Sequence, residues 1–355
     1  MPTMPAAVSA ATGAAAPAPA AAKVVVEDIY GFLRVLDDGT VLRSPEGPDF
    51  CPATFPAAHP SVEWKEAVYD EASGLRVRMY RPLSAAGKGA GAAKLPVLVH
   101  FHGGGFCLGS CTWANVHAFC LRLAAGARAV VLSAGYRLAP EHRLPAAFDD
   151  GAGFMRWLRD QSSAADGGWL AEAADFGRVF VTGDSAGGAI AHHLAVRAGG
   201  GKRGLDDLAP VTVRGYVLLM PFFGGVRRTR SEAECPAEVL LNLDLFDRFW
   251  RLSLPAGATR DHPAANPFGP QSPDLGSVDF LPVLVVAGGL DMMRDRVAHY
   301  ARRLAAMGKP VEFVEFAGEP HGFYTLDPGS EVTGELIGVV RRFVHGCAAE
   351  SVLVA

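Results

Sequence analysis

Apolar residues along the chain fall into short runs that alternate with longer segments of helical periodicity. Runs of strand length that are rich in apolar residues occupy residues 95–101, 129–134, 179–183, 213–220, 281–287 and 311–316. Helix-like segments occupy residues 118–125, 148–161, 186–198, 295–307 and 331–344. Strands that are apolar on both faces are typical of a parallel sheet covered by helices on its two sides. The pattern therefore predicts an α/β fold with a mostly parallel central sheet flanked by helices.

The segment ahead of the first apolar run has a different pattern, in which polar and apolar positions alternate. Residues 62–69 and 75–82 alternate with a period of two, which predicts two half-buried strands. Residues 34–43 contain an Asp-Gly turn between two short runs and predict a hairpin. Residues 27–33 have the spacing of a short amphipathic helix.

The regular alternation defines one large domain, which we expect to span residues 23–346. The alternation stops once, at residues 222–280, where Pro-rich loops surround an aromatic, helix-like segment at 239–252. We interpret this insertion as a cap over the site; a long surface excursion is the alternative. Residues 1–22 are almost entirely Ala, Pro, Ser, Thr and Gly and predict a disordered leader, and residues 347–355 a short tail.

Composition and charge exclude several classes of function. The 355 residues carry a formal net charge of -4 with no basic stripe, so no nucleic-acid partner is expected. No run approaches the roughly 20 apolar residues of a membrane span. The six cysteines show neither a Cys-x-x-Cys pair nor metal-ligand spacing, which favours a reduced intracellular chain, located in the cytoplasm and able to diffuse into the nucleus.

A Gly-x-Ser-x-Gly sequence follows the apolar run at 179–183 and precedes the helix-like segment at 186–198. That context predicts a nucleophile elbow, in which Ser185 sits on a tight turn between strand and helix. Gly183 and Gly187 flank the serine, because a side chain at either position would crowd the turn. Without the strand before it and the helix after it, the pentapeptide would fit an ordinary Gly-rich turn as well as a nucleophile elbow.

A serine hydroxyl needs a base to accept its proton and an acid to orient that base. In the elbow architecture these partners follow the serine in the order acid, then histidine, each beyond a strand. Asp291 follows the run at 281–287 and His321 follows the run at 311–316, so both are predicted to be catalytic. The other acidic and histidine residues near the motifs are expected to act as helix caps or packing groups, or to point elsewhere on the turn, and not to be catalytic. They are Asp184, Asp295, His142, His192 and His193.

The tetrahedral intermediate of such a reaction needs fixed hydrogen-bond donors. The amide of Ala186 directly after the serine is one predicted donor, and the Gly-rich loop after the run at 95–101 supplies Gly103 and Gly104. A phosphate-binding loop would be expected to end in Lys-Ser/Thr, which is absent here. No carboxylate or histidine is spaced to join His102 around a metal, so neither a metal nor a cofactor is expected.

Several motifs together resemble the hormone-sensitive-lipase-like branch of the α/β-hydrolases, and most closely the plant carboxylesterases of the carboxylesterase 15-like group. The resemblance covers roughly residues 28–344 and rests on these stretches: His102-Gly-Gly-Gly-Phe106, Tyr136-Arg-Leu-Ala-Pro-Glu141, Gly183-Asp-Ser-Ala-Gly-Gly188, the Asp291 segment, Pro320-His-Gly-Phe323, Phe222-Phe-Gly-Gly225 and residues 249–262. It implies an α/β-hydrolase fold and a serine carboxylesterase. It also implies that the N-terminal segment, residues 23–60, forms part of a lid.

The aromatic residues named below could line an apolar pocket, which favours a small hydrophobic ester or lactone as substrate. The resemblance adds catabolism of strigolactone-type hormones as a specific hypothesis. Two alternatives stay open. Gibberellin receptors of this branch lack the catalytic histidine, whereas this chain keeps His321. Isoflavonoid dehydratases use the same scaffold. We expect an apolar pocket drawn from aromatic residues, of which about half are plain core: Phe106, Phe222, Phe223, Phe249, Trp250, Phe268, Phe323 and Tyr324. The sequence does not reveal the oligomeric state.

Overall fold

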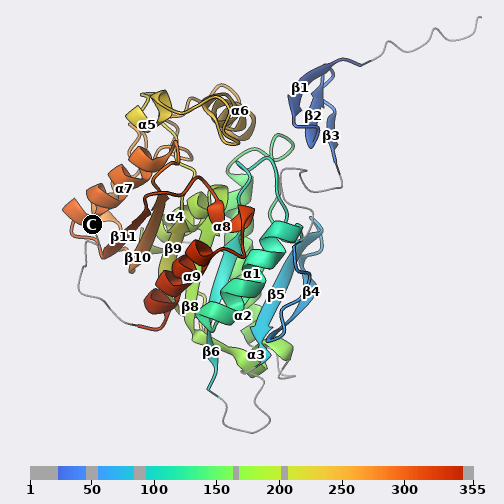
Figure 1. Ribbon diagram of the computed structural model, residues 1–355, viewed down its shortest axis with the longest axis vertical. Helices are drawn as coiled ribbons and strands as arrows, with labels where there is room; N and C mark the ends of the chain where they lie inside the picture. The colour runs from blue at the N-terminus through green and yellow to red at the C-terminus, as the bar shows by residue number, and fades with distance from the viewer. Residues whose placement is uncertain (1–22, 45–54, 84–92, 163–167, 201–206, 347–355) are drawn as a thin grey trace, which may run out of the picture.

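The computed structural model of the chain describes residues 23–44, 55–83, 93–162, 168–200 and 207–346 (Figure 1). The expected leader and tail lie outside these residues. Among the helices of this described part, none has the length and apolar character that crossing a membrane requires.

A central sheet of eight strands organises the described chain. Its order is β11-β10-β9-β8-β6-β7-β5-β4, with parallel pairing from β11 through to β7 and antiparallel pairing of β5 with both β7 and β4. The mostly parallel sheet predicted from the apolar runs is thus confirmed. The strands are β4 (Val62–Asp70), β5 (Leu75–Pro82), β6 (Leu95–Phe101), β7 (Val130–Ala134), β8 (Ala174–Asp184), β9 (Val213–Leu219), β10 (Val283–Gly288) and β11 (Val311–Phe316).

Helices cover both faces of this sheet and bury two separate hydrophobic cores. Alternate residues of a strand serve different cores: Val97 and Val99 of β6 belong to one, and Leu98 to the other. Helices α1 (Ala114–Ala127), α8 (Phe323–Leu326) and α9 (Glu331–Val344) pack into the core of Leu98. The core of Val97 takes α2 (Ala146–Ser162), α3 (Trp169–Ala173), α4 (Ala186–Gly199) and α7 (Arg294–Ala306).

The N-terminal residues form a small antiparallel sheet of their own, β1 (Val25–Ile29), β2 (Leu33–Leu36) and β3 (Val41–Arg43). The hairpin predicted at 34–43 is confirmed. The helix predicted at 27–33 is wrong, because Ile29 pairs with Leu33 across a tight turn. Asp28 accepts a hydrogen bond from the amide of Gly31, which adopts a positive φ of 72°. The apolar spacing that suggested a helix instead places Ile29 and Leu33 together in the core.

Polar contacts tie this small sheet to the main domain at two places. Arg43 donates to the carbonyls of Cys107 and Ala139, at 2.7 Å each, and forms an ion pair with Glu141. Glu27 is 8% exposed and forms ion pairs with Arg248 and Arg251. These contacts are long-range in sequence, so they fix the small sheet against the insertion and against the Gly-rich loop.

The insertion at 222–280 contains α5 (Arg230–Ala233), α6 (Leu243–Ser253) and the 3₁₀ turn η2 (Leu275–Ser277). Figure 1 shows α5 and α6 together at one end of the sheet, beside α7. Helix α6 buries Phe246, Phe249 and Trp250. It begins four residues later than the predicted 239, because the Asn242 side chain caps it by accepting from the amide of Leu245.

Candidate active site

The turn between β8 and α4 holds Ser185 in a strained conformation, with φ 52° and ψ −114°. Two glycines allow this turn to pack. A Cβ on Gly187 would lie 1.9 Å from the carbonyl oxygen of Phe101, and a Cβ on Gly183 would lie 2.3 Å from the backbone of Gly187. Backbone atoms therefore enforce both glycines: the end of β6 excludes a side chain at position 187, and the turn itself excludes one at position 183.

Asp291 and His321 lie beyond the ends of β10 and β11, and they are joined by a hydrogen bond. Nδ1 of His321 is 2.7 Å from Oδ2 of Asp291, which is 3% exposed. The other oxygen, Oδ1, accepts from the amide of Met293 at 2.9 Å, which fixes the carboxylate. Because a carboxylate only accepts, Nδ1 carries the proton and Nε2 has its lone pair free.

The carboxylates near His321 control its proton affinity. Burial alone lowers the pKa of His321, but the charge of Asp291, the hydrogen bond to it and the charge of Asp184 outweigh burial and leave the pKa raised. The imidazolium form is therefore stabilised in the folded protein. A base that must hold a proton during a reaction benefits from that stabilisation.

The Gly-rich loop after β6 lies directly against the serine turn. A Cβ on Gly103 would come within 2.4 Å of Oδ2 of Asp184 and 3.2 Å of the Cβ of Ser185. Gly104 has a φ of 112°, and its carbonyl accepts from the amides of Cys107 and Leu108. Within the described residues, no acceptor is paired with the amides of Gly103, Gly104 or Ala186. These three N–H groups are available to a ligand.

Two rings hold this loop in place. The hydroxyl of Tyr136 donates to the carbonyl of His102 at 2.8 Å, and the two rings stack with centroids 4.4 Å apart. Nδ1 of His102 donates to the carbonyl of Gly103 at 2.8 Å. Burial lowers the pKa of His102 to about 4, so it is neutral and serves as a structural group. In the described part of the chain, no three His, Cys, Asp or Glu side chains gather as a possible metal site.

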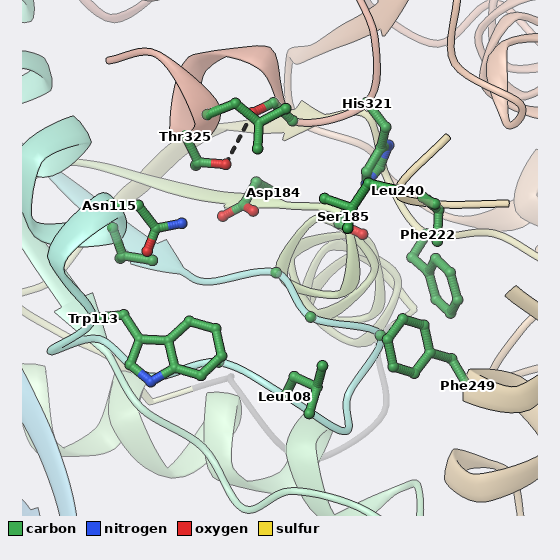
Figure 2. A pocket seen from close by; sticks show the side chains of 18 of the residues that line it. Leu108, Trp113, Asn115, Asp184, Ser185, Phe222, Leu240, Phe249, His321 and Thr325 are labelled. Carbon is green, nitrogen blue, oxygen red and sulfur yellow. Dashed lines mark hydrogen bonds between the residues drawn. The ribbon is translucent and has the colours of Figure 1, made fainter. Parts of the chain in front are cut away.

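One pocket has Ser185, His321 and the Gly-rich loop in its lining (Figure 2). We call the side formed by Phe222, Phe249 and Leu240 the apolar lobe. The opposite side, formed by Trp113, Asn115 and Thr325, is called the mixed lobe. Figure 2 shows Ser185 between the two lobes. Tyr30 of the N-terminal sheet also lines the pocket, which places this sheet at its border.

The structure corrects the predicted pocket lining. Phe222 lines the pocket, as does Phe249. The other six aromatic candidates do not line it. Phe268 is partly buried against one core, and five side chains are buried in the two cores: Phe106, Phe223, Trp250, Phe323 and Tyr324. Trp250, for example, stacks on the outer side of Phe222 with ring centroids 4.5 Å apart. Phe222 thus faces the pocket, and Trp250 supports it from behind without reaching the pocket.

Asp184 also differs from expectation, because its side chain lines the pocket instead of pointing elsewhere. His192 and His193 are packing groups as predicted: His192 bonds the hydroxyl of Tyr300 at 2.8 Å, and His193 stacks on Phe148. Asp295 accepts from the amide of Ser231 and is not part of the pocket.

Sequence reasoning missed the mixed lobe. The available signal was weak: Asn115 lies near the start of a mostly apolar helix that also carries His117 and Arg122, and Thr325 lies four residues beyond His321.

Comparison with known proteins agrees with this geometry. Residues 98–325 match a family model described as alpha/beta hydrolase fold. The chain is 40% identical over 251 residues to probable carboxylesterase 6 of Arabidopsis thaliana, covering 68% of this chain and 69% of that protein. It is 38% identical to the gibberellin receptor GID1 of Oryza sativa subsp. japonica, covering 78% and 79%.

Among solved structures, the hyperthermophilic esterase from the archaeon Pyrobaculum calidifontis superposes with a TM-score of 0.65 at 29% identity, covering 82% of this chain and 87% of that one. The predicted fold is confirmed, and the expected class of carboxylic ester hydrolase is confirmed at the level of the family. The chain belongs to the alpha/beta hydrolases, in the group that contains plant carboxylesterases and gibberellin receptors.

Proposed function

We propose that the protein is a serine carboxylesterase that hydrolyses a small hydrophobic ester or lactone through an acyl-enzyme. The observation that carries the proposal is the hydrogen bond between Nδ1 of His321 and Asp291, in a site whose pocket also contains Ser185. This bond leaves Nε2 of His321 as the free base. The strained elbow and the unpaired amides of the Gly-rich loop support the same reading.

In the proposed reaction, Oγ of Ser185 attacks the ester carbonyl carbon while Nε2 of His321 takes the hydroxyl proton. The carbonyl oxygen becomes an oxyanion that accepts from the amides of Gly103, Gly104 and Ala186. The intermediate collapses, the bond to the alkoxy oxygen breaks, and His321 gives its proton to that oxygen. Water then attacks the acyl-serine, gives a proton to His321, and the acid leaves as Ser185 recovers its hydrogen.

The lining supports an uncharged substrate. Lys and Arg are absent from the described residues that line the pocket, and the apolar lobe offers only hydrocarbon surface. A carboxylate would therefore find no cation to pair with.

We further propose that the enzyme is of the carboxylesterase 15-like type, acts on strigolactone-type hormones, and works in the cytoplasm with diffusion into the nucleus. The motifs of the sequence support the proposed enzyme type and hormone, and the cysteine pattern supports the proposed location.

The direct test replaces the nucleophile. Ser185→Ala should abolish hydrolysis of p-nitrophenyl butanoate, and a fluorophosphonate probe should label the wild type on Ser185 alone, as mapped by mass spectrometry. Activity that survives in Ser185→Ala would reject the mechanism. The same pair of proteins, incubated with a strigolactone analogue, tests the hormone hypothesis: cleavage no faster than in Ser185→Ala would reject it.

A hormone-binding role is the second candidate. It is supported by the small N-terminal sheet, which borders the pocket through Tyr30 and is held to α6 by Glu27. Tight hormone binding without turnover by the wild type would favour this candidate. Product masses that show loss of water instead of ester cleavage would favour the dehydratase alternative.

A further inference from the structure

The mixed lobe contains a buried amide that the protein itself leaves unused. Asn115 is the second residue of α1 and is 9% exposed. Among the described residues its side chain has no hydrogen-bond partner, and its polar end borders the pocket. Its side-chain amide is therefore open to the pocket, where water or a ligand can pair with it. Polar groups in an otherwise apolar pocket commonly fix the orientation of a ligand.

A carboxylate oxygen faces this amide. Asp184 is 7% exposed, and its Oδ1 lies 3.3 Å from Nε2 of the fully buried His100. Its Oδ2 is the atom nearest to the place that a Cβ on Gly103 would take, and within the described chain it is paired with no hydrogen-bond donor. Figure 2 shows the polar ends of Asn115 and Asp184 turned toward each other on the same side of the pocket, with no hydrogen bond drawn between them.

The two groups together specify what can lie between them. An ionised carboxylate only accepts hydrogen bonds, whereas the side-chain amide can donate. A hydroxyl group satisfies both, because it donates to Oδ2 of Asp184 and accepts from Nδ2 of Asn115. Asp184 precedes Ser185 directly in the chain, so a group bound there is close to the bond that the serine attacks.

We propose that Asn115 and Asp184 form a subsite that binds a hydroxyl group carried by the substrate near its scissile carbonyl. The inference rests on the proposed esterase function and narrows its substrate class to hydroxylated esters or lactones. The hydroxyl enters the mixed lobe while the remaining hydrocarbon lies in the apolar lobe.

Other polar groups fit less well. A carboxylate would face Asp184, and the described lining residues offer it no Lys or Arg. An ammonium group would lose its hydration on entering a pocket that is otherwise largely apolar. A hydroxyl is neutral, and both of its hydrogen-bonding roles are met.

Pairs of esters that differ by one hydroxyl test the subsite. p-Nitrophenyl 3-hydroxybutanoate and 3-methylbutanoate exchange OH for CH₃ in the acyl half, and 2-hydroxyethyl butanoate and propyl butanoate do so in the alcohol half. We expect wild type to favour the hydroxylated member of one pair by about tenfold in kcat/KM. Asn115→Leu should bring that ratio close to one while it still hydrolyses the member that carries CH₃ in place of OH.

Leu245→Val, which changes the hydrophobic lining away from this amide, is the matched control and should keep the hydroxyl preference. A wild-type ratio near one for both pairs, or an unchanged ratio in Asn115→Leu, would overturn the proposal. Preference for p-nitrophenyl 3-aminobutanoate over its hydroxy counterpart would overturn it in favour of an amine site.

Binding separates failure of this subsite from failure of the esterase function. Calorimetric dissociation constants for the same esters can be measured in Ser185→Ala and in Ser185→Ala/Asn115→Leu, where no turnover is needed. About tenfold tighter binding of the hydroxylated ester only when Asn115 is present would support the subsite even if wild type hydrolysed nothing. Equal binding in both proteins would reject the subsite even if wild type were an active esterase.

Discussion

Gly187→Ala is the most direct test of how the serine turn and the Gly-rich loop are held together. The new Cβ would lie 1.9 Å from the carbonyl oxygen and 2.5 Å from the carbonyl carbon of Phe101, and 2.9 Å from the carbonyl oxygen of His102. All three atoms are backbone, so no side chain can rotate away. Restoring ordinary contact requires the end of β6 to move by about 1.5 Å from the turn.

That displacement should harm activity more than stability. Overpacking of this kind typically costs about 1–3 kcal/mol, and replacing a helical Gly with Ala returns up to about 1 kcal/mol. The net loss in the free energy of unfolding should be about 2 kcal/mol. A shift of about 1 Å in a positioning group can lower the rate about 100-fold, and here Gly103 and Gly104 would move away from Ser185.

Urea unfolding measures the first effect, and kcat/KM with p-nitrophenyl butanoate measures the second. Gly188→Ala is the matched control on the same helix, because its Cβ would meet its nearest neighbour, in Pro221, at 3.0 Å. We expect it to lose much less activity. If Gly187→Ala kept wild-type stability and activity, the close approach of loop and turn would not be what assembles the site.

Three further changes probe separate features. Asp291→Asn should lower kcat by about 10⁴-fold through the wrong His321 tautomer; because Asp291 raises the pKa of His321, the acid limb of the kcat/KM profile should also move to lower pH, and an unmoved limb would contradict this. Glu27→Gln should cost about 2 kcal/mol in urea unfolding, since it leaves two arginines short of a partner, whereas Lys23→Gln, which removes an exposed pair, should leave the unfolding midpoint nearly unchanged. Burial lowers the pKa of His193 from 6.5 to about 4, so its stabilising contribution is complete above pH 6.5 and is lost as pH falls toward 4; His193→Phe should reduce the slope of thermal stability against pH over that interval, where His102 and His192 still contribute, and a slope equal to wild type would count against the assignment.

The central sheet could be predicted closely because most of its buried strands coincide with an apolar run of their own. The strand at 311–316 has the predicted bounds, and so does the helix at 331–344. The positions of Ser185, Asp291 and His321 beyond strand ends followed from the same pattern, since parallel strands bring their carboxyl ends to one edge.

The pocket lining could not be predicted in the same way. Hydrophobicity indicates that an aromatic ring is buried, but it does not indicate whether the ring faces a cavity or another ring. Phe222 faces the pocket, whereas Trp250 packs on Phe222. The turn at Gly31 was missed because Ile29 and Leu33 have the same spacing in a helix as in a tight hairpin that packs on the core. Asp184 was misplaced because the rotation of a side chain on a strained turn depends on neighbours from β6, far away in sequence.

The φ of 52° at Ser185 has a consequence for how this protein can change over evolutionary time. A backbone conformation of this kind costs about 1–3 kcal/mol when a side chain is present. The chain therefore gives up conformational stability at the one residue where it holds its nucleophile. Loss of catalysis through replacement of Ser185 by glycine would relieve that strain, so a lineage that kept only ligand binding could gain stability in the same step. At this position, selection for turnover and selection for a robust fold act in opposite directions.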